Sequence, residues 1–214
     1  MVIFLSDNGM SFPFAKTNVY FSSTRTVWVV RWPGMVKPGL EDRKHFISGT
    51  DLMPTILEAA GLAPVEGVDG RSFLPLLMGK KQKGREQVFT VCYKTAGGHL
   101  FPMRCIQDQD FGYIYNGWSD QKTVFYNEGL NGMSFKAMQR AAKENLQIAQ
   151  RVKLLRFRVV DELFHFGRDP DALENLVDDP QYRDTLARMR NTMADVMEQT
   201  GDPLLGSFRK HLEG

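Results

Sequence analysis

The sequence has few cysteines and no long apolar run, and both absences narrow its class. Its 214 residues contain only Cys92 and Cys105, too few for a disulfide framework, although one bridge between them is conceivable. No apolar stretch approaches the roughly 20 residues that a membrane-spanning helix needs. The first residues, Met1–Leu5, lack the basic region and the cleavage site of a secretory signal peptide. These absences predict a globular piece of protein without a membrane span.

A strong charge of either sign is also missing. The 27 Lys and Arg residues nearly balance the 25 Asp and Glu residues, which leaves a formal net charge of +2. Composition therefore indicates neither nucleic acid nor a membrane surface as a partner. With 43% hydrophobic residues, the chain can bury a core in one or two domains. Three of its four histidines, His45, His165 and His211, stand singly and without the spacing of metal ligands.

A possible cation site follows the first apolar run. Val2–Leu5 reads as a strand, and Ser6-Asp7-Asn8-Gly9 comes directly after it. Asp7 and Asn8 offer the oxygen ligands that Ca²⁺ or Mg²⁺ takes, at a strand end where open α/β sheets bind ligands. The sequence Asp-Asn-Gly after a strand is also typical of a hairpin turn, so both interpretations stay open.

Further motifs resemble the sulfatases of the alkaline-phosphatase-like superfamily. They occur in family order over most of the chain, and a strand like that of the heparan N-sulfatase (sulfamidase) branch lies among them. The segments are Ser6–Gly9 with Lys16, Tyr20, Arg25 and Trp32-Pro33-Gly34; Asp51–Leu57 with Gly61; Asp69–Leu77; Phe101-Pro102-Met103-Arg104; and Glu162–Leu176. Lys16 departs from the N-sulfatase branch, which tends to carry Arg there, so the resemblance to the family is firmer than the resemblance to the branch.

The resemblance implies an α/β protein with two parts. Residues 1–80 would be the C-terminal part of a sulfatase-like central sheet, and residues 81–214 a smaller α+β domain with an antiparallel sheet and a C-terminal helix. The basic, glycine-bounded stretch Gly79–Arg85 reads as an exposed linker between them.

Local patterns predict the individual elements. A helix should begin at Thr50 or Asp51 and end at Gly61. Periods of three and four predict one long helix from Ser134 to about Lys153, and Pro180 should open a final helix. The expected strands are Val2–Leu5, Thr26–Arg31, Gln87–Tyr93, Met103–Gln107, Phe111–Tyr115 and Glu162–Phe166.

The resemblance also implies site residues. Asp7 and Asn8 would supply two ligands of a Ca²⁺ ion, and Lys16 would contact the sulfate as a catalytic residue. Tyr20 and Arg25 are expected to support the loop rather than touch substrate. His99, in the loop before the Arg104 strand, and Arg104 itself are candidates for binding a sulfated saccharide. The plainer alternatives are a solvated lysine, an exposed loop histidine and an arginine paired with a carboxylate.

The nucleophile of the family is not found in this sequence. Neither cysteine lies in a CxPSR or SxPSR element, whose Cys or Ser is oxidised to formylglycine in sulfatases. We therefore interpret the chain as a C-terminal fragment that is inactive alone. The resemblance implies that the complete enzyme acts in the periplasm, the lysosome or the extracellular space. A related phosphoesterase or phosphonate hydrolase, and a non-catalytic glycan-binding module, remain as alternatives.

Two surface properties are expected as well. Strands taken from a larger sheet would expose an edge and an apolar face, so the N-terminal third should self-associate. The segment from Lys136 to Arg158 is rich in Lys and Arg, with Glu144 as its only acidic residue. Such a run is usually a solvated helix face, and the alternative is an attractive field for an anionic glycan.

Overall fold

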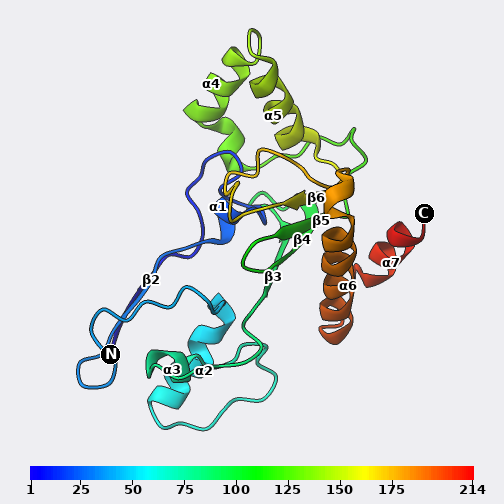
Figure 1. Ribbon diagram of the computed structural model, residues 1–214. Coiled ribbons are helices and arrows are strands. Elements are labelled where there is room, and N and C mark those ends of the chain that lie inside the picture. The colour runs from blue at the N-terminus through cyan, green and yellow to red at the C-terminus, as the bar shows by residue number, and fades with distance from the viewer. The chain divides into compact units, whose positions relative to one another are not determined.

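The computed structural model describes all 214 residues, which divide into two compact units (Figure 1). Unit 1 comprises Met1–Asp7 and Thr26–Val88, and unit 2 comprises Asn8–Arg25 and Phe89–Gly214. The chain thus leaves unit 1 after its first strand, adds a loop to unit 2, and returns. The second division falls after Val88, eight residues beyond the boundary that the sequence pattern suggests. None of the helices combines the length and the apolarity needed to cross a bilayer.

The two strands of unit 1 form a small antiparallel sheet. Strand β1 (Val2–Leu5) pairs with β2 (Trp28–Arg31), and Phe4 lies opposite Val29. The prediction that these two apolar runs are neighbouring strands is therefore confirmed. Phe4 and Val29 are nevertheless 66% and 54% exposed. This sheet presents apolar side chains that unit 1 does not cover.

Helix α2 of unit 1 lies where the sequence predicts a helix, and the short helix α3 was not predicted. A 3₁₀ turn, η1 (Gly49–Asp51), leads into α2 (Leu52–Ala59), and Ser48 and Asp51 form a capping box at its start. Gly61 ends the helix with φ of +70°, a conformation that costs glycine little. A short helix, α3 (Leu74–Leu77), follows with proline in its first turn.

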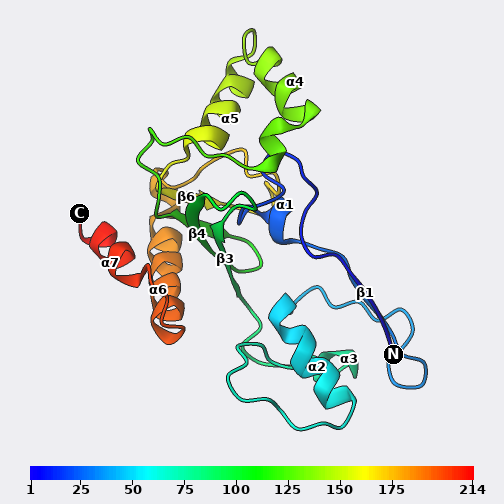
Figure 2. The ribbon, with the colours of Figure 1, turned by 180° about the vertical axis from the view of Figure 1, so that it is seen from behind.

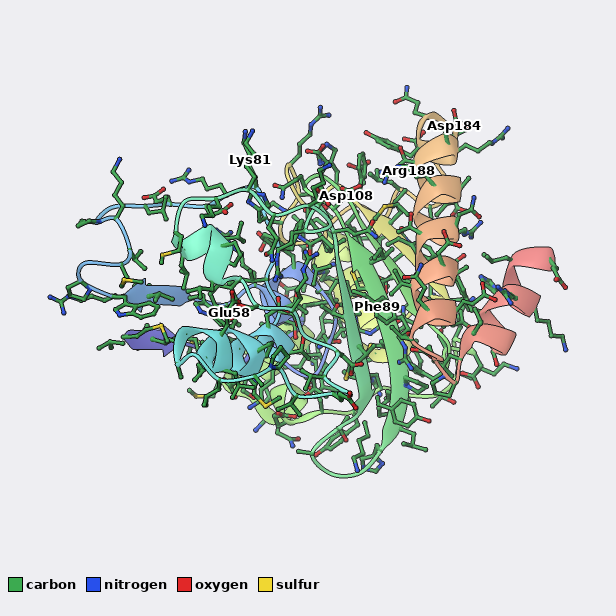
Figure 3. All side chains as sticks on the ribbon, turned by 90° about the horizontal axis from the view of Figure 1, so that it is seen from below. Glu58, Lys81, Phe89, Asp108, Asp184 and Arg188 are labelled. Atoms are coloured by element: carbon green, nitrogen blue, oxygen red, sulfur yellow. The ribbon has the colours of Figure 1, made fainter.

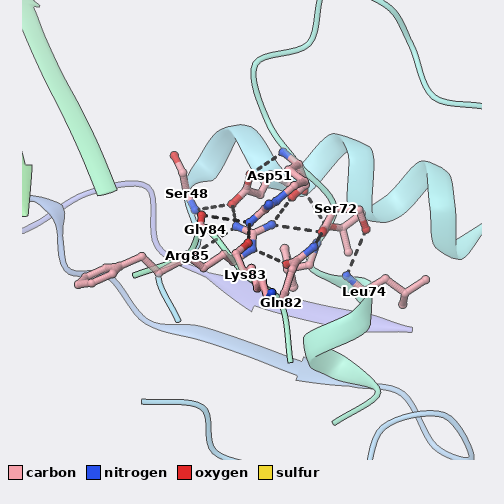
Figure 4. Close-up of polar contacts among 12 residues, drawn as sticks. Ser48, Asp51, Ser72, Leu74, Gln82, Lys83, Gly84 and Arg85 are labelled. Atoms are coloured by element: carbon pink, nitrogen blue, oxygen red, sulfur yellow. Dashed lines mark hydrogen bonds and ion pairs between the residues drawn. The ribbon is translucent and has the colours of Figure 1, made fainter. Parts of the chain in front are cut away.

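Arg85 corrects the expectation of an exposed linker over Gly79–Arg85. Its guanidinium is buried and lies 2.6 Å from the Asp51 carboxylate, and it also donates to the side chain of Gln82 (Figure 4). Backbone carbonyls of Phe46, Arg71 and Ser72 accept its remaining hydrogen bonds. The end of the basic stretch is thus a buried clamp of unit 1, because each guanidinium N–H finds an acceptor.

Unit 2 is built on a four-stranded sheet in the order β3 (Val88–Lys94), β4 (Leu100–Gln107), β5 (Gly112–Asn116) and β6 (Asp161–Phe164). Strand β5 is antiparallel to both of its neighbours, and all residues of β5 and β6 are buried. Side chains alternate between the faces, as the period of two requires. One apolar cluster includes Ile114 and Phe164, and another includes Tyr113, Tyr115 and Leu163.

One face of this sheet is covered by the C-terminal helices. After η3 (Pro180–Tyr182), helix α6 (Arg183–Gln199) crosses β4 and β5, and α7 (Leu205–Glu213) follows (Figures 1 and 2). Their buried side chains pack on Tyr113, Tyr115 and Leu163; they are Leu186, Met189, Met193, Met197 and Phe208. Figure 3 labels Arg188 of α6 and Asp108 of the β4–β5 turn, which form an ion pair at 2.8 Å. The final helix is confirmed, and α7 adds a second one that the sequence analysis did not predict.

The other face carries a loop, a short helix and a helical hairpin. These are the loop before α1 (Phe21–Thr24), the turn η2 (Glu128–Asn131), and helices α4 (Met133–Ala141) and α5 (Leu146–Phe157). The single long helix predicted from Ser134 to about Lys153 is wrong. Residues 142–145 form a turn, and the side chain of Asn145 caps α5 by accepting the N–H of Ile148.

Both cysteines are free thiols. Cys105 is buried and Cys92 is half-buried, so the bridge considered from the sequence is not formed. Burial raises the pKa of both thiols, which keeps them protonated and poorly reactive.

Candidate functional site

The loop that carries Lys16 is held in a strained conformation by the core of unit 2. Phe14 and Thr17 on either side of it have φ of +64° and +54°, a region that non-glycine residues rarely adopt. Such residues each cost on the order of 1–3 kcal/mol and persist where the surroundings enforce them. Phe14, Val19 and Tyr20 are buried in the cluster on the sheet. This packing fixes the loop against β4–β6 and leaves Lys16 at its turn.

Hydrogen bonds from two asparagines fix the backbone of Lys16. The side-chain amides of Asn18 and Asn127 both donate to its carbonyl oxygen, at 2.7 and 2.9 Å. Its ammonium group lies 3.6 Å from the carboxylate of Glu128, and the lysine side chain is 37% exposed. The Glu128 carboxylate also accepts from the hydroxyl of Thr17. Lys16 is therefore a positioned cation that remains accessible to an anion.

A buried network behind the loop is centred on Arg158. This arginine is 2% exposed and donates to the hydroxyl of Tyr20 at 2.8 Å and to the side-chain oxygen of Asn18. The Tyr20 hydroxyl in turn donates to the fully buried Glu162 at 2.6 Å, and Asn116 donates to the other oxygen of that carboxylate. The guanidinium lies over the rings of Phe14, Tyr20 and Phe125.

Burial dominates the titration of this network. It raises the pKa of Tyr20 well above its ordinary value, although the cation of Arg158 opposes the shift. Burial likewise raises the pKa of Glu162, against the same cation and the two hydrogen bonds that the carboxylate accepts. Tyr20 thus has a neutral hydroxyl, which accepts a hydrogen bond from Arg158 and donates one to Glu162. The expectation that Tyr20 supports the loop agrees with this position.

His99 belongs to unit 2, as Lys16 does, and both residues contact the segment of residues 126–128. It follows the turn Thr95–Gly98 between β3 and β4, where Gly98 has φ of +83° and the N–H of Thr95 donates to the His99 carbonyl. The imidazole is exposed, and its ring centroid is 5.9 Å from that of Tyr126. Tyr126 immediately precedes Asn127 and Glu128, which hold Lys16. Residues 126–128 therefore connect the two predicted site residues.

Asp7 and Asn8 fall at the point where the chain passes from unit 1 to unit 2. Asp7 is exposed and Asn8 is half-buried. Their side-chain oxygens suit a hard cation, but Ca²⁺ takes six to eight oxygen ligands. The chain contains no group of three or more His, Cys, Asp or Glu side chains placed to hold a metal ion. The donor chemistry therefore fits Ca²⁺, and most of the coordination shell would have to come from other groups.

Arg104 lies where a substrate could not easily reach it. It is 2% exposed, and its Nε and Nη2 donate to the two carboxylate oxygens of Asp202 at 2.6 and 3.0 Å. A third hydrogen bond goes to the carbonyl of Met103. This bidentate pair ties β4 to the turn between α6 and α7. The geometry favours the carboxylate-paired alternative over the substrate contact that the resemblance suggested.

Three residues around Lys16 were not identified from the sequence as parts of the site. Asn127 and Glu128 belong to no motif, and Arg158 looked like one more cation of a solvated basic run. The reading of that run is wrong for Arg158, and also for Arg151, whose guanidinium lies 3.6 Å from the centroid of the Phe14 ring and donates to backbone carbonyls. Its burial and its φ of +55° set Arg158 apart from the other cations of the run, and the sequence shows neither property.

Comparison of the sequence with known proteins identifies relatives of this chain. The family described as "N-sulphoglucosamine sulphohydrolase, C-terminal" matches residues 10–128, more than half of the chain. An ulvan-active sulfatase of Formosa agariphila is 28% identical over 208 residues, which are 95% of this chain and 38% of that protein. Human N-sulphoglucosamine sulphohydrolase is 25% identical over 95% of this chain and 42% of its own length. The chain thus spans about two fifths of these curated relatives.

Solved structures share the fold at lower sequence identity. A 2-O GAG sulfatase superposes with a TM-score of 0.60 at 20% identity, over 86% of this chain and 32% of that one. A phosphonate monoester hydrolase of Agrobacterium radiobacter reaches 0.56 at 20% identity, over 86% and 32% of the respective chains. At these identities the likeness establishes the fold alone, which sulfatases and phosphonate hydrolases have in common.

Proposed function

This chain belongs to the N-sulphoglucosamine sulphohydrolase C-terminal family of sulfatases, and from that membership we propose that it supplies the C-terminal part of a sulfatase acting on a sulfated sugar. The reaction would be hydrolysis of a sulfate ester or sulfamate, in which water replaces the sugar oxygen or nitrogen on sulfur. The nucleophile would come from residues outside these 214, because the sequence contains no CxPSR or SxPSR element.

The position of Lys16 carries the proposal. An SO₃ group in transfer spreads its charge over peripheral oxygens, so catalysis rests on cations placed to neutralise them. Lys16 is held by two hydrogen bonds to its backbone, and its ammonium group is accessible beside Glu128. An ammonium is a compact point charge rather than a bidentate fork, which suffices for one sulfonyl oxygen.

The remaining site residues have supporting roles in this proposal. Asp7 and Asn8 would provide two oxygen ligands to Ca²⁺, which would neutralise further oxygens of the sulfate when bound. His99 would meet the sugar from the β3–β4 turn, where an exposed imidazole can donate or accept a hydrogen bond. Arg104 would act only through the packing of β4 against Asp202.

The test is to examine the in-frame coding sequence immediately upstream of residue 1 and to express the joined protein. We expect a CxPSR or SxPSR element upstream, and release of inorganic sulfate from a sulfated glucosamine. The phosphonate hydrolase alternative predicts two bound metal ions and turnover of phosphonate esters instead. Heparin affinity without any turnover of the joined protein would favour the glycan-binding module.

A further inference from the structure

The hairpin of α4 and α5 has a charge unlike that of the rest of the chain. Residues 133–157 contain six Lys and Arg residues and one acidic residue, Glu144, in a chain whose formal net charge is +2. The rest of the chain therefore carries more acidic than basic side chains. The six cations are Lys136, Arg140, Lys143, Arg151, Lys153 and Arg156. Such a local excess creates a positive field that the net charge conceals.

None of these six cations has an ion-pair partner in the structure. The guanidinium of Arg151 is instead held by the protein, because it lies over Phe14 and donates to the carbonyls of Asp171 and Ala172. Lys136, Arg140, Lys143 and Lys153 are exposed, and Arg156 is half-buried. Exposed arginines elsewhere do pair with carboxylates, as Arg43 does with Glu41 and Arg209 with Glu198. The positive charge of the hairpin is thus not neutralised by the protein itself.

The hairpin is joined to the loop that carries Lys16. Within unit 2, α4 and α5 lie side by side and extend away from the β3–β6 sheet in both ribbon views (Figures 1 and 2). At their base, Arg151 of α5 contacts Phe14, and η2 leads from Glu128 into α4. Glu128 is the partner of Lys16 and Thr17. An extended anion on the hairpin would therefore end close to Lys16.

We infer that the α4–α5 hairpin is a binding surface for a sulfated polysaccharide and holds the chain that flanks the sugar being hydrolysed. Closely spaced sulfates on a flexible chain match several exposed ammonium and guanidinium groups gathered on one hairpin, and the counterions of the sulfates are released on binding, as for other polyanions. The hairpin has no Trp or Tyr, its Phe135 is buried, and its only other aromatic residue, Phe157, is half-buried beneath the guanidinium of Arg156, so it lacks the row of exposed rings on which single-stranded nucleic acid stacks. The choice of a sulfated partner rests on the proposed function.

The test measures equilibrium binding of heparin to the full 214-residue chain at several salt concentrations. The first variant combines Lys136→Gln, Arg140→Gln, Lys143→Gln and Lys153→Gln. Glutamine is a good helix former, so the hairpin should remain folded, and circular dichroism checks this. The matched control combines Lys37→Gln, Lys80→Gln, Lys81→Gln and Lys83→Gln, four exposed lysines of unit 1. Both variants lower the formal charge by the same amount.

We expect the hairpin variant to bind heparin at least about thirtyfold more weakly and to lose about three units from the slope of log K against log salt. The control should stay within about threefold of the wild type, because distant surface charges are screened. Equal losses in both variants would overturn the inference, and so would unchanged binding by the hairpin variant. Tighter binding of duplex DNA than of heparin at equal salt would also overturn it, in favour of a nucleic-acid surface.

Lys16→Ala separates this inference from the proposed function. The substitution removes one cation that contacts sulfate and leaves the four exposed cations of the hairpin intact, so heparin affinity of the chain should fall much less than in the fourfold hairpin variant. Loss of sulfate release by the joined protein with retained heparin binding supports both proposals. Retained heparin binding without any sulfatase activity in the wild type would refute the proposed function alone, since equilibrium binding requires no turnover.

Discussion

Units 1 and 2 bury very different kinds of side chain. Unit 1 has five buried residues, of which only Phe73 and Leu76 are apolar, and the other three are Asp51, Thr55 and Arg85. Both large apolar clusters belong to unit 2, where they lie on the two faces of the β3–β6 sheet. Unit 2 therefore has a core of its own, whereas unit 1 depends on a polar clamp and exposes apolar strands. We therefore expect unit 2 to be the more stable unit, and unit 1 to offer the accessible apolar surface.

The largest effect is expected at the buried cation of unit 2. Arg158→Met should lower the free energy of unfolding by about 3–5 kcal/mol, because Glu162 would remain buried without its cation. Chemical denaturation followed by far-ultraviolet circular dichroism measures this. Arg140→Met, an exposed arginine of α4, is the matched control and should change stability by less than about 0.5 kcal/mol. A loss at Arg158 no larger than the control's would show that the network does not stabilise unit 2.

The second effect tests whether the units are independent. Arg85→Met should destabilise unit 1 by about 3 kcal/mol, since the Asp51 carboxylate loses its buried partner. Amide hydrogen exchange should then speed up in η1 and α2 and stay unchanged in β5 and β6. Arg71→Met serves as the comparison, because the Arg71 guanidinium reaches only the exposed carbonyls of Lys83 and Gly84. Equal loss of protection in both units would mean that they unfold together.

The exposed strands of unit 1 lead to a third prediction. We expect the chain to self-associate at micromolar concentration through β1 and β2, because Phe4 and Val29 are exposed side by side. The double variant Phe4→Glu, Val29→Lys places opposite charges at directly paired positions and should keep the strands paired while making the protein monomeric. Light scattering distinguishes the two. A monomeric wild type at that concentration would contradict the prediction.

The smallest effect concerns the pair of Lys16 and Glu128. A bound anion would compete with Glu128 for the ammonium group, so Glu128→Gln should strengthen sulfate binding about two- to fivefold, as removal of a partly exposed ion pair allows. Isothermal titration with sulfate measures this affinity. Glu144→Gln, which removes an exposed carboxylate from the hairpin turn, should have a smaller effect. A weaker affinity in Glu128→Gln than in the wild type would mean that Glu128 positions Lys16 rather than competes for it.

Elements with strong local signals could be predicted from the sequence. The end of α2 at Gly61, the alternation in β4–β6 and the Pro180 helix start are local properties, and the structure has them. The split between α4 and α5 was missed because apolar spacing continues across residues 142–145, where the side chain of Asn145 caps a new helix.

The candidate site was predictable only in part. Motif order located Lys16, but its partners Asn127 and Glu128 lie 111 and 112 positions further along the chain and match no motif. Arg85, Arg104 and Arg158 show why the roles of charged residues are the hardest to predict from a sequence. Each is a buried cation whose acceptors come from distant segments, and sequence alone reads such residues as solvated or functional.

The most direct test of the account is sulfate release from N-sulfated glucosamine by the protein that joins this chain to its upstream coding sequence. Lys16→Ala is compared there with Lys37→Ala, an exposed lysine of unit 1. We predict that Lys16→Ala lowers kcat by about a hundredfold or more, the usual scale for removing one group that stabilises transition-state charge, and that Lys37→Ala does not. Equal turnover by the two variants would contradict the assignment of Lys16 to the reacting sulfate.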